Sequence, residues 1–352
     1  MGAVGTSGSG PRGRARIEDV ARASEVSVAT VSRALRGLPN VAESTRLRVM
    51  AVAADLHYQP DPAAARLAAG RTRTVIVMVP HLASWYFSTV IAGAEAVCNE
   101  SGYEFVVVGV GSLTECTRLL ADTTHLERRA DGVIVVNIPV TDEQDASLHE
   151  RRIALSTVGV RAGGAPSVFV DDNAVGHLAA TTLAGLGHRR IAMLSGQDAD
   201  PLNFAVPTRR AMGFRAGLAD VGLTLPDDFV VGGNFGIDGG REAAVRLLDL
   251  PEPPTAVFAM SDEMAFGALM ELEHRGLRPG VDVSVLGVDD HDAARVVGLS
   301  TIRQDVGSQG ATAARSLVAE MSEGRVVGPT DRVEPVMSPI ELVLRRTTGP
   351  VC

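Results

Sequence analysis

The sequence IEDVARASEVSVATVSRAL, residues 17–35, predicts two short helices joined by a tight turn. Apolar residues recur at helical spacing in the first half, at Ile17, Val20 and Ala21, and again at positions 28, 31 and 35. Ser27 lies where the second helix would begin, and its hydroxyl can accept a hydrogen bond from an N–H group of the first turn. The alternative is a helical hairpin that only packs against its neighbours.

The outward face of the predicted second helix is small, hydrogen-bonding and cationic. It carries Ala29, Thr30, Ser32, Arg33 and Arg36, the kind of surface that a helix needs in the DNA major groove. Residues 1–73 contain eleven arginines and six acidic residues, a net charge of +5, whereas the remainder carries −14 of the chain total of −9. This basic head favours a module that binds a polyanion, with a salt-sensitive affinity.

The rest of the head has three expected parts. Residues 43–56 form a third helix, with Leu47, Met50, Ala51 and Ala54 on one apolar face. The prolines at 60 and 62 end that region, and residues 63–69 form at most a short helix that needs a partner. We therefore expect a disordered tail at 1–15, a helix-turn-helix domain at 16–59 and a hinge helix or linker at 60–72.

Composition excludes several classes of protein. A chain of 352 residues is long enough for about two or three domains. Its three cysteines, at 98, 116 and 352, form no CxxC pair, so we expect neither a disulfide framework nor a metal site. The sequence contains no run of about 18 apolar residues and no export signal, so we expect a cytoplasmic protein without a membrane partner.

The body alternates strands with helices. Near-continuous apolar runs at 74–79, 103–109, 131–136, 189–195, 255–260 and 283–288 are separated by helical stretches. This pattern is typical of parallel sheets that are covered by helices on both faces. The fold class is therefore α/β for the body, in two units that fit a two-lobed binding fold.

The head motifs DVARASEVSVATVSRAL, NVAESTRLRV and HYQPDPAAARLAAGRTRTV resemble the lactose/galactose repressor (LacI/GalR) family of bacterial regulators, from about residue 17 to residue 346. The resemblance implies a three-helix head, a hinge helix and a periplasmic-binding-protein-like core at 73–348. It places lobe 1 at 73–184 and 305–335, and lobe 2 at 185–304 and 336–348. It also implies a homodimer that binds a palindromic operator in double-stranded DNA and responds to a small-molecule effector.

The resemblance assigns DNA contacts to matched positions. Val28 and Ala29 would meet base edges, Arg33 would face a guanine, and Leu67 would unstack a base step in the minor groove unless it only packs in its helix. The implied DNA-binding set is Ser27, Val28, Ala29, Thr30, Ser32, Arg33, Tyr58, Ala64 and Leu67.

Four head positions depart from the family pattern. Arg16 and Ala42 replace the residues that usually cap two helices, and a lost cap costs about 1 kcal/mol. Glu25 replaces the usual turn glycine, at a backbone position suited to positive φ. Asp61 replaces an asparagine and would place a carboxylate near phosphates. These changes affect the affinity and the operator sequence, not DNA binding itself.

Most candidate effector residues follow predicted strands, where ligands of such folds bind. The resemblance implies ligand contacts for Asp172, Arg210 and Asp289. Aromatic rings suit the apolar face of a sugar or a planar base, and an arginine fork can grip vicinal hydroxyls or a carboxylate. Core packing for the rings and solvated loops for the charges are the alternatives. The set is Trp85, Tyr86, Phe87, Asp172, Arg210, Ser261, Asp262 and Asp289.

Three functions compete at this point. The first is a repressor that responds to a sugar or sugar derivative, with a nucleoside or purine as the alternative effector. The second is a sugar-binding receptor without a DNA role. The third is an enzyme, which is disfavoured because HExxH, GxSxG and GxxxxGK[ST] motifs are all absent from the sequence. We expect no cofactor. Whether the effector induces or corepresses stays open.

Overall fold

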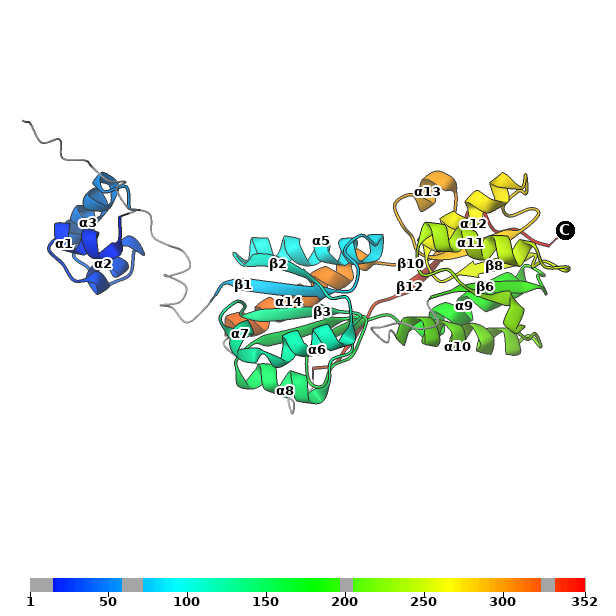
Figure 1. Ribbon diagram of the computed structural model, residues 1–352, viewed down its shortest axis with the longest axis horizontal. Coiled ribbons are helices and arrows are strands. Elements are labelled where there is room, and N and C mark those ends of the chain that lie inside the picture. The colour runs from blue at the N-terminus through cyan, green and yellow to red at the C-terminus, as the bar shows by residue number, and fades with distance from the viewer. Residues whose placement is uncertain (1–14, 59–71, 197–204, 324–332, 352) are drawn as a thin grey trace, which may run out of the picture. The chain divides into compact units, whose positions relative to one another are not determined.

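The computed structural model describes residues 15–58, 72–196, 205–323 and 333–351 (Figure 1). The chain divides into two compact units, Met1–Thr72 and Arg73–Cys352, which we call the head and the core. Within the described ranges, every helix is too short or too polar to cross a membrane. The expected tail at 1–15 and hinge at 60–72 fall almost wholly outside the described residues.

The head is a three-helix cluster made of α1 (Ile17–Ala23), α2 (Val28–Leu35) and α3 (Glu43–Asp55). Its small core consists of two residues from each helix: Val20, Ala21, Val31, Ala34, Val49 and Ala53. Glu25, in the turn between α1 and α2, has a φ of 54°, as its position predicts. The structure therefore confirms the helix-turn-helix.

The predicted apolar face of α3 is wrong. Leu47 and Met50 are 60% and 53% exposed, and Ala51 and Ala54 are exposed too. The buried positions are Val49 and Ala53. Apolar residues occur almost all round this helix, so spacing alone does not determine which side faces α1 and α2.

The helix starts in the head differ in how they are capped. The hydroxyl of Ser27 accepts a hydrogen bond from the Thr30 N–H at 3.1 Å, as predicted for α2. Arg16 cannot accept such a bond, but the Asp19 carboxylate accepts one from the Arg16 backbone N–H at 3.0 Å. Ala42 has no polar side chain to offer α3. One of the two missing caps is therefore partly compensated.

The core contains two six-stranded sheets with matching strand orders, β11-β5-β4-β3-β1-β2 and β12-β10-β9-β8-β6-β7. Within these two sheets all pairings are parallel except that of β10 with β12. All the strands predicted from apolar runs are present. The first sheet is formed by β1 (Thr74–Val79), β2 (Glu104–Gly109), β3 (Gly132–Val136), β4 (Ala154–Val158), β5 (Ser167–Phe169) and β11 (Val336–Met337). The second is formed by β6 (Ile191–Ser195), β7 (Val230–Gly232), β8 (Ala256–Ala259), β9 (Ser284–Asp289), β10 (Ser300–Gln304) and β12 (Ile340–Val343).

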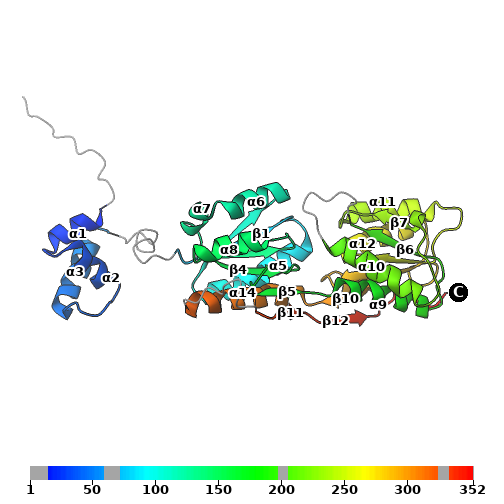
Figure 2. The same cartoon turned by 90° about the horizontal axis from the view of Figure 1, so that it is seen from below.

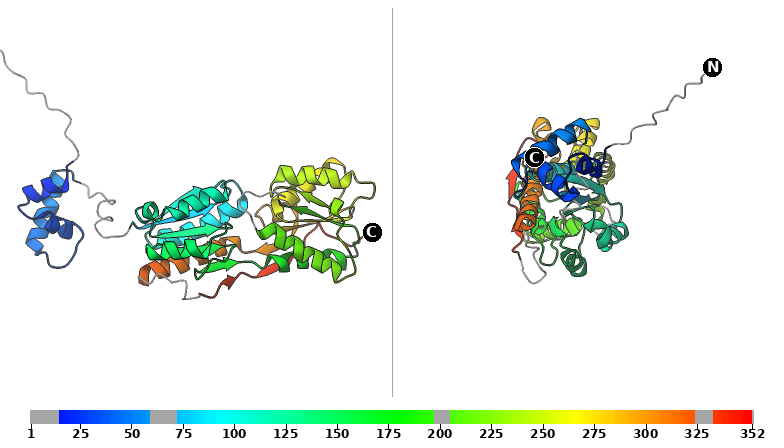
Figure 3. Two further views of the ribbon diagram at one scale, coloured as in Figure 1. Left: turned by 60° about the horizontal axis from the view of Figure 1, so that its bottom comes forward. Right: turned by 90° about the vertical axis from the view of Figure 1, so that its left-hand side faces the viewer.

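Helices cover both faces of each sheet, so each sheet and its helices form one lobe (Figures 1 and 3). In lobe 1, α5 and α14 pack on one face, and α6, α7 and α8 pack on the other. In lobe 2, α9 and α10 lie on the opposite face from α11 and α12 (Figure 1). The helices are α5 (Trp85–Glu100), α6 (Leu113–Ala121), α7 (Thr123–Glu127), α8 (Asp142–Glu150), α9 (Asp172–Gly185), α10 (Ala205–Ala219), α11 (Ile237–Leu248), α12 (Asp262–His274), α13 (Ala294–Val297) and α14 (Val306–Glu323), with a 3-10 turn at Asp227–Phe229.

The chain crosses between the lobes at places that only partly match the expected boundaries. The crossing near 304 fits the end of β10. The crossing near 184 is wrong, because Val175 and Leu183 of α9 belong to the core of lobe 2, so the chain crosses near residue 170. The boundary at 336 is also early, because Val336 and Met337 pair with β5 of lobe 1. Figure 2 shows β11 and β12 following one another from lobe to lobe.

Candidate DNA-binding face and effector site

The outward face of α2 carries the predicted DNA-contacting side chains. Ala29 and Arg33 are exposed, while Thr30 and Ser32 are partly exposed. Val28, which the apolar spacing placed inward, is 42% exposed at the first turn and belongs to the same face. The opposite side of α2 is anchored by its buried residues, so this face is presented by a fixed helix.

The remaining predicted DNA residues lie at the end of the head or beyond it. Tyr58 packs against the head core, and its backbone N–H donates to the Ala53 carbonyl at 2.8 Å. Ala64 and Leu67 lie outside the described residues. The minor-groove contacts of these two residues therefore stay a prediction.

A cavity of about 240 Å³ lies between the two lobes of the core. Most of its polar residues come from the carboxyl ends of strands or from the helix starts that follow them, as expected for this type of fold. The lining residues are His81, Ser84, Tyr86, Phe87, Asn137, Gly159, Val170, Asp172, Val206, Pro207, Arg210, Asn234, Phe235, Met260, Ser261, Glu263, Asp289, Gln304 and Gln309. Of the predicted residues, Tyr86, Phe87, Asp172, Arg210, Ser261 and Asp289 line this cavity.

A buried ion pair forms one wall of the cavity. Arg210 Nε donates to Asp172 Oδ1 at 2.8 Å, and the two side chains are only 6% and 7% exposed. Arg210 also donates through Nη1 to the Met260 carbonyl oxygen. Burial raises the pKa of the Asp172 carboxyl, and the charge of Arg210 acts against that rise. The protein itself therefore supplies the partners of Arg210.

Close packing of α9 on α10 brings the two charges together. A Cβ atom at Gly176 would overlap the Arg210 carbonyl oxygen, and one at Gly213 would overlap the Asn173 carbonyl oxygen. The adjacent Asp171, not Asp172, caps α9 by accepting hydrogen bonds from the N–H groups of residues 173 and 174. Asp172 is therefore available for Arg210 and the cavity.

Asp289 is the second buried acid of the cavity. Burial raises its pKa to about 7, although the nearby charge of Arg210 and a hydrogen bond from Gln304 both lower it. Gln304 Nε2 donates to Asp289 Oδ1 at 2.6 Å, and Gln309 Nε2 donates to Gln304 Oε1 at 3.1 Å. The Tyr86 hydroxyl donates to Gln309 Oε1 at 3.4 Å. A line of hydrogen bonds thus joins an aromatic of lobe 1 to a carboxylate of lobe 2.

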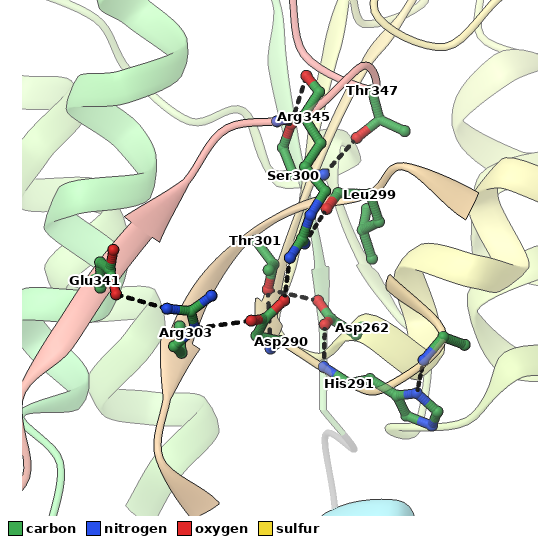
Figure 4. A network of polar contacts seen from close by, with 11 residues as sticks. Asp262, Asp290, His291, Leu299, Ser300, Thr301, Arg303, Glu341, Arg345 and Thr347 are labelled. Atoms are coloured by element: carbon green, nitrogen blue, oxygen red, sulfur yellow. Dashed lines mark hydrogen bonds and ion pairs between the residues drawn. The ribbon is translucent and has the colours of Figure 1, made fainter. Parts of the chain in front are cut away.

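A polar network holds the backbone beside Asp289 (Figure 4). Asp289 and Asp290 have φ values of 120° and 57°, which L-residues rarely adopt. The Asp290 carboxylate accepts from Arg303 Nε at 2.7 Å and from Arg345 Nη2 at 2.6 Å. Arg303 also donates to Glu341 on β12. The network therefore fixes this strained turn to the strands that lead towards lobe 1.

Asp262, a predicted effector residue, belongs to this network instead of the cavity wall (Figure 4). It is fully buried, and its carboxylate accepts from Thr301 Oγ1 at 2.7 Å and from the His291 backbone N–H at 2.8 Å. Burial raises its pKa well above the ordinary value, and the neighbouring charge of Asp289 adds to the rise. Both carboxylate oxygens of Asp262 are therefore engaged within the protein, and the predicted ligand contact of Asp262 stays a prediction.

Trp85 is also absent from the described residues that line the cavity. Its indole lies 4.7 Å, centroid to centroid, from the His291 ring of lobe 2, and its Nε1–H donates to Asp292 Oδ2 at 3.3 Å. The indole ring therefore packs against the opposite lobe. It does not line the cavity, where stacking on a ligand is expected.

The sequence interpretation missed several cavity residues. Asn137 directly follows β3, a predicted strand, so the rule that selected Asp289 would have selected it as well. Gln304 ends β10, a strand that the apolar runs did not predict. Glu263 lies two residues after Ser261 at the start of α12. No feature of the sequence marked Phe235 as a cavity residue, because its position depends on a turn in which it adopts a φ of 56°. Among the residues described, no cluster of three potential metal-binding side chains occurs.

A helix-turn-helix with a cationic outward face, followed by a two-lobed core with a polar cavity, defines a ligand-binding regulator of transcription. Residues 16–61 match the family model of bacterial regulatory proteins of the lacI family, and residues 180–348 match the periplasmic binding protein-like domain. The chain belongs to the lacI family. It is a DNA-binding transcriptional repressor whose core serves effector control.

Similarity to individual proteins extends over nearly the whole chain. Catabolite control protein A of Priestia megaterium is 31% identical over 314 residues, which cover 88% of this chain and 93% of that protein. The Lac repressor dimer bound to operator and the anti-inducer ONPF has a TM-score of 0.78 at 27% identity, covering 95% of this chain and 99% of the other. A complex of the transcriptional regulator CelR with cellobiose has a TM-score of 0.66 at 28% identity, covering 95% and 100%.

Proposed function

We propose that this chain forms a homodimeric repressor that binds a palindromic operator through α2 and senses a sugar or sugar derivative in the interlobe cavity. The observation that carries the proposal is the buried set of Asp172, Arg210 and Asp289 facing a cavity between two lobes. Buried charges with built-in partners are costly to assemble, so they favour specific recognition of a small ligand. The protein acts in the cytoplasm, without a catalytic step.

A polyol fits this cavity better than a purely apolar ligand. Carboxylates accept hydrogen bonds from hydroxyls, and side-chain amides both donate to hydroxyls and accept from them. The rings of Tyr86, Phe87 and Phe235 provide an apolar surface for the face of a sugar ring. The volume of about 240 Å³ lies just below the usual range for ligand pockets, which favours a compact ligand. The CelR–cellobiose complex adds support by likeness. A nucleoside is the second candidate, because a base could stack on the same rings.

On the DNA side, we assign the head at 16–59 to the major groove. Val28 and Ala29 contact base edges, Arg33 pairs with a guanine, and Ser27, Thr30 and Ser32 position the helix on phosphates or bases. Tyr58 supports the exit of the chain towards residues 60–72. There, Ala64 and Leu67 enter the minor groove when two copies pair on the operator.

Two measurements test this function. Selection of bound sequences from random double-stranded DNA, with the purified full chain, should enrich one palindrome. Thermal-shift screening of mono- and disaccharides and nucleosides should find a ligand that raises the melting temperature, because such a ligand binds only the native state. Enrichment without symmetry would contradict the dimeric operator, and stabilisation by nucleosides alone would replace the sugar.

A further inference from the structure

Glu263 of lobe 2 reaches across the cleft to the first turn of α5 in lobe 1. Ser84 Oγ donates to Glu263 Oε2 at 3.3 Å, and the Trp85 backbone N–H donates to the same carboxylate. Ser84 is the N-cap residue of α5, yet its own side chain does not cap that helix. Glu263, a residue of the opposite lobe, therefore caps α5.

This contact is electrostatically favourable. The first N–H groups of a helix lack intrahelical partners, and the helix dipole places partial positive charge at the N-terminus. A carboxylate placed there receives hydrogen bonds and stabilises the helix end. Burial raises the pKa of the Glu263 carboxyl, and the hydrogen bonds from Ser84 and Trp85 act against that rise.

A second contact joins the lobes beside the first. The Trp85 indole lies against the His291 ring and donates to Asp292, both in lobe 2. The His291 backbone is itself held by Asp262, and the Phe266 ring packs edge-to-face with the His291 ring at 5.2 Å between ring centroids. The surface that meets Trp85 is therefore fixed by the polar network behind it.

We infer that these two contacts, Glu263 on the start of α5 and Trp85 on His291 and Asp292, form a latch that holds the two lobes against each other. Ser84 and Glu263 also line the cavity, so the latch and the ligand share atoms. A ligand that hydrogen-bonds to Glu263 competes with Ser84 and Trp85 and loosens the latch. That last step rests on the proposed effector site, whereas the latch itself does not.

The chain offers a direct probe, because Trp85 is its single tryptophan. Quenching of tryptophan fluorescence by acrylamide, in the full chain without DNA or effector, reports how far the latch is open. Glu263→Ala should raise the open-to-closed ratio about fivefold, the factor that corresponds to about 1 kcal/mol for one lost helix cap. The quenching constant should rise accordingly. Glu242→Ala, an exposed glutamate on α11, is the matched control and should leave quenching unchanged.

Two further variants keep the inference falsifiable if Glu263→Ala fails to fold, which circular dichroism would show. Glu263→Gln keeps the size and one acceptor but removes the charge, and Ser84→Ala removes one donor, so both should raise quenching to a smaller extent. Full accessibility of Trp85 in the wild type, or equal protection in every variant, would overturn the latch. Since the assay contains neither DNA nor ligand, failure of the proposed function would leave its result unchanged.

Discussion

The head and the core use arginine in opposite ways. Arg33 lies exposed on α2, whereas Arg210 is 5% exposed and is fixed by Asp172 and the Met260 carbonyl. The charge of an exposed arginine stays solvated, so it costs little free energy, and the side chain can contact a large partner at the surface. A buried arginine needs a partner within the protein, and it can then recognise only a molecule that fits the cavity beside it.

The strongest test of this contrast is to leave the buried pair incomplete. Arg210→Met keeps much of the apolar volume but leaves the Asp172 carboxylate buried without its cation. We expect the free energy of unfolding of the core to fall by about 3–5 kcal/mol, because an uncompensated buried charge is strongly destabilising. Urea unfolding followed by circular dichroism measures the change.

The control removes both charges. The double variant Asp172→Leu with Arg210→Met should recover much of the lost stability, since replacing a whole buried pair by apolar side chains is often nearly neutral. It should still lose the ligand response. If the double variant is no more stable than the single one, the pair is not the source of the destabilisation.

The close approach of α9 and α10 is the next test. Gly213→Ala places a Cβ against the Asn173 backbone, so we expect about 1–3 kcal/mol lower stability from overpacking and a displaced ion pair. Gly185→Ala, at the end of α9, is the matched control, because its Cβ would have nothing within 4 Å. Similar urea midpoints for the two variants would show that the close approach does not matter.

Stability should depend on pH through the buried acids of the core. The pKa of Asp289 is raised to about 7, so the folded state holds a proton that the unfolded chain releases near pH 4. Stability from this group is therefore present at low pH and is lost as the pH rises towards 7, with a slope of at most about 1.4 kcal/mol per pH unit. Asp289→Asn should flatten the profile between pH 4 and 7, and an identical profile would contradict the raised pKa.

The smallest expected effect lies in the head. Ser27→Ala removes the cap of α2, which should lower the stability of the head by about 1 kcal/mol and leave the core transition in place. Ser27→Asp retains an acceptor and should restore most of the loss. Two unfolding transitions followed separately would check this, and a shift of both would contradict the independence of the two units.

Much of the fold could be predicted from local pattern. Strands such as β1 and β3 were clear because their residues are apolar throughout, whereas β4 and β10 were missed because buried serine and threonine interrupt the pattern. The wrong face of α3 and the crossing placed near 184 share one cause. Each depends on which of several apolar surfaces a helix packs against, and that is decided by distant parts of the chain.

The candidate site shows the same limit more sharply. Asp262 and Asp289 both follow strands of the second sheet, and the sequence gives no reason to separate them. In the structure, Thr301 and the His291 backbone engage Asp262, while Asp289 faces the cavity. Trp85 is predicted to bind the effector because of its aromatic ring, but in the structure the ring contacts His291 and Asp292 across the cleft. The sequence can predict that a side chain lies at the end of a strand, but the direction in which that side chain points is determined by the tertiary structure.

We propose that the exposed Arg33 reads DNA while the buried Asp289 senses the effector. The most direct test measures both functions for Arg33→Ala and Asp289→Asn, using the selected operator and the stabilising ligand. Arg33→Ala should lose about 1–3 kcal/mol of specific operator binding, keep salt-sensitive binding to random DNA and keep the ligand-induced thermal shift. Asp289→Asn should bind the operator normally and lose the thermal shift. Unchanged operator preference in Arg33→Ala, or an intact thermal shift in Asp289→Asn, would contradict the account.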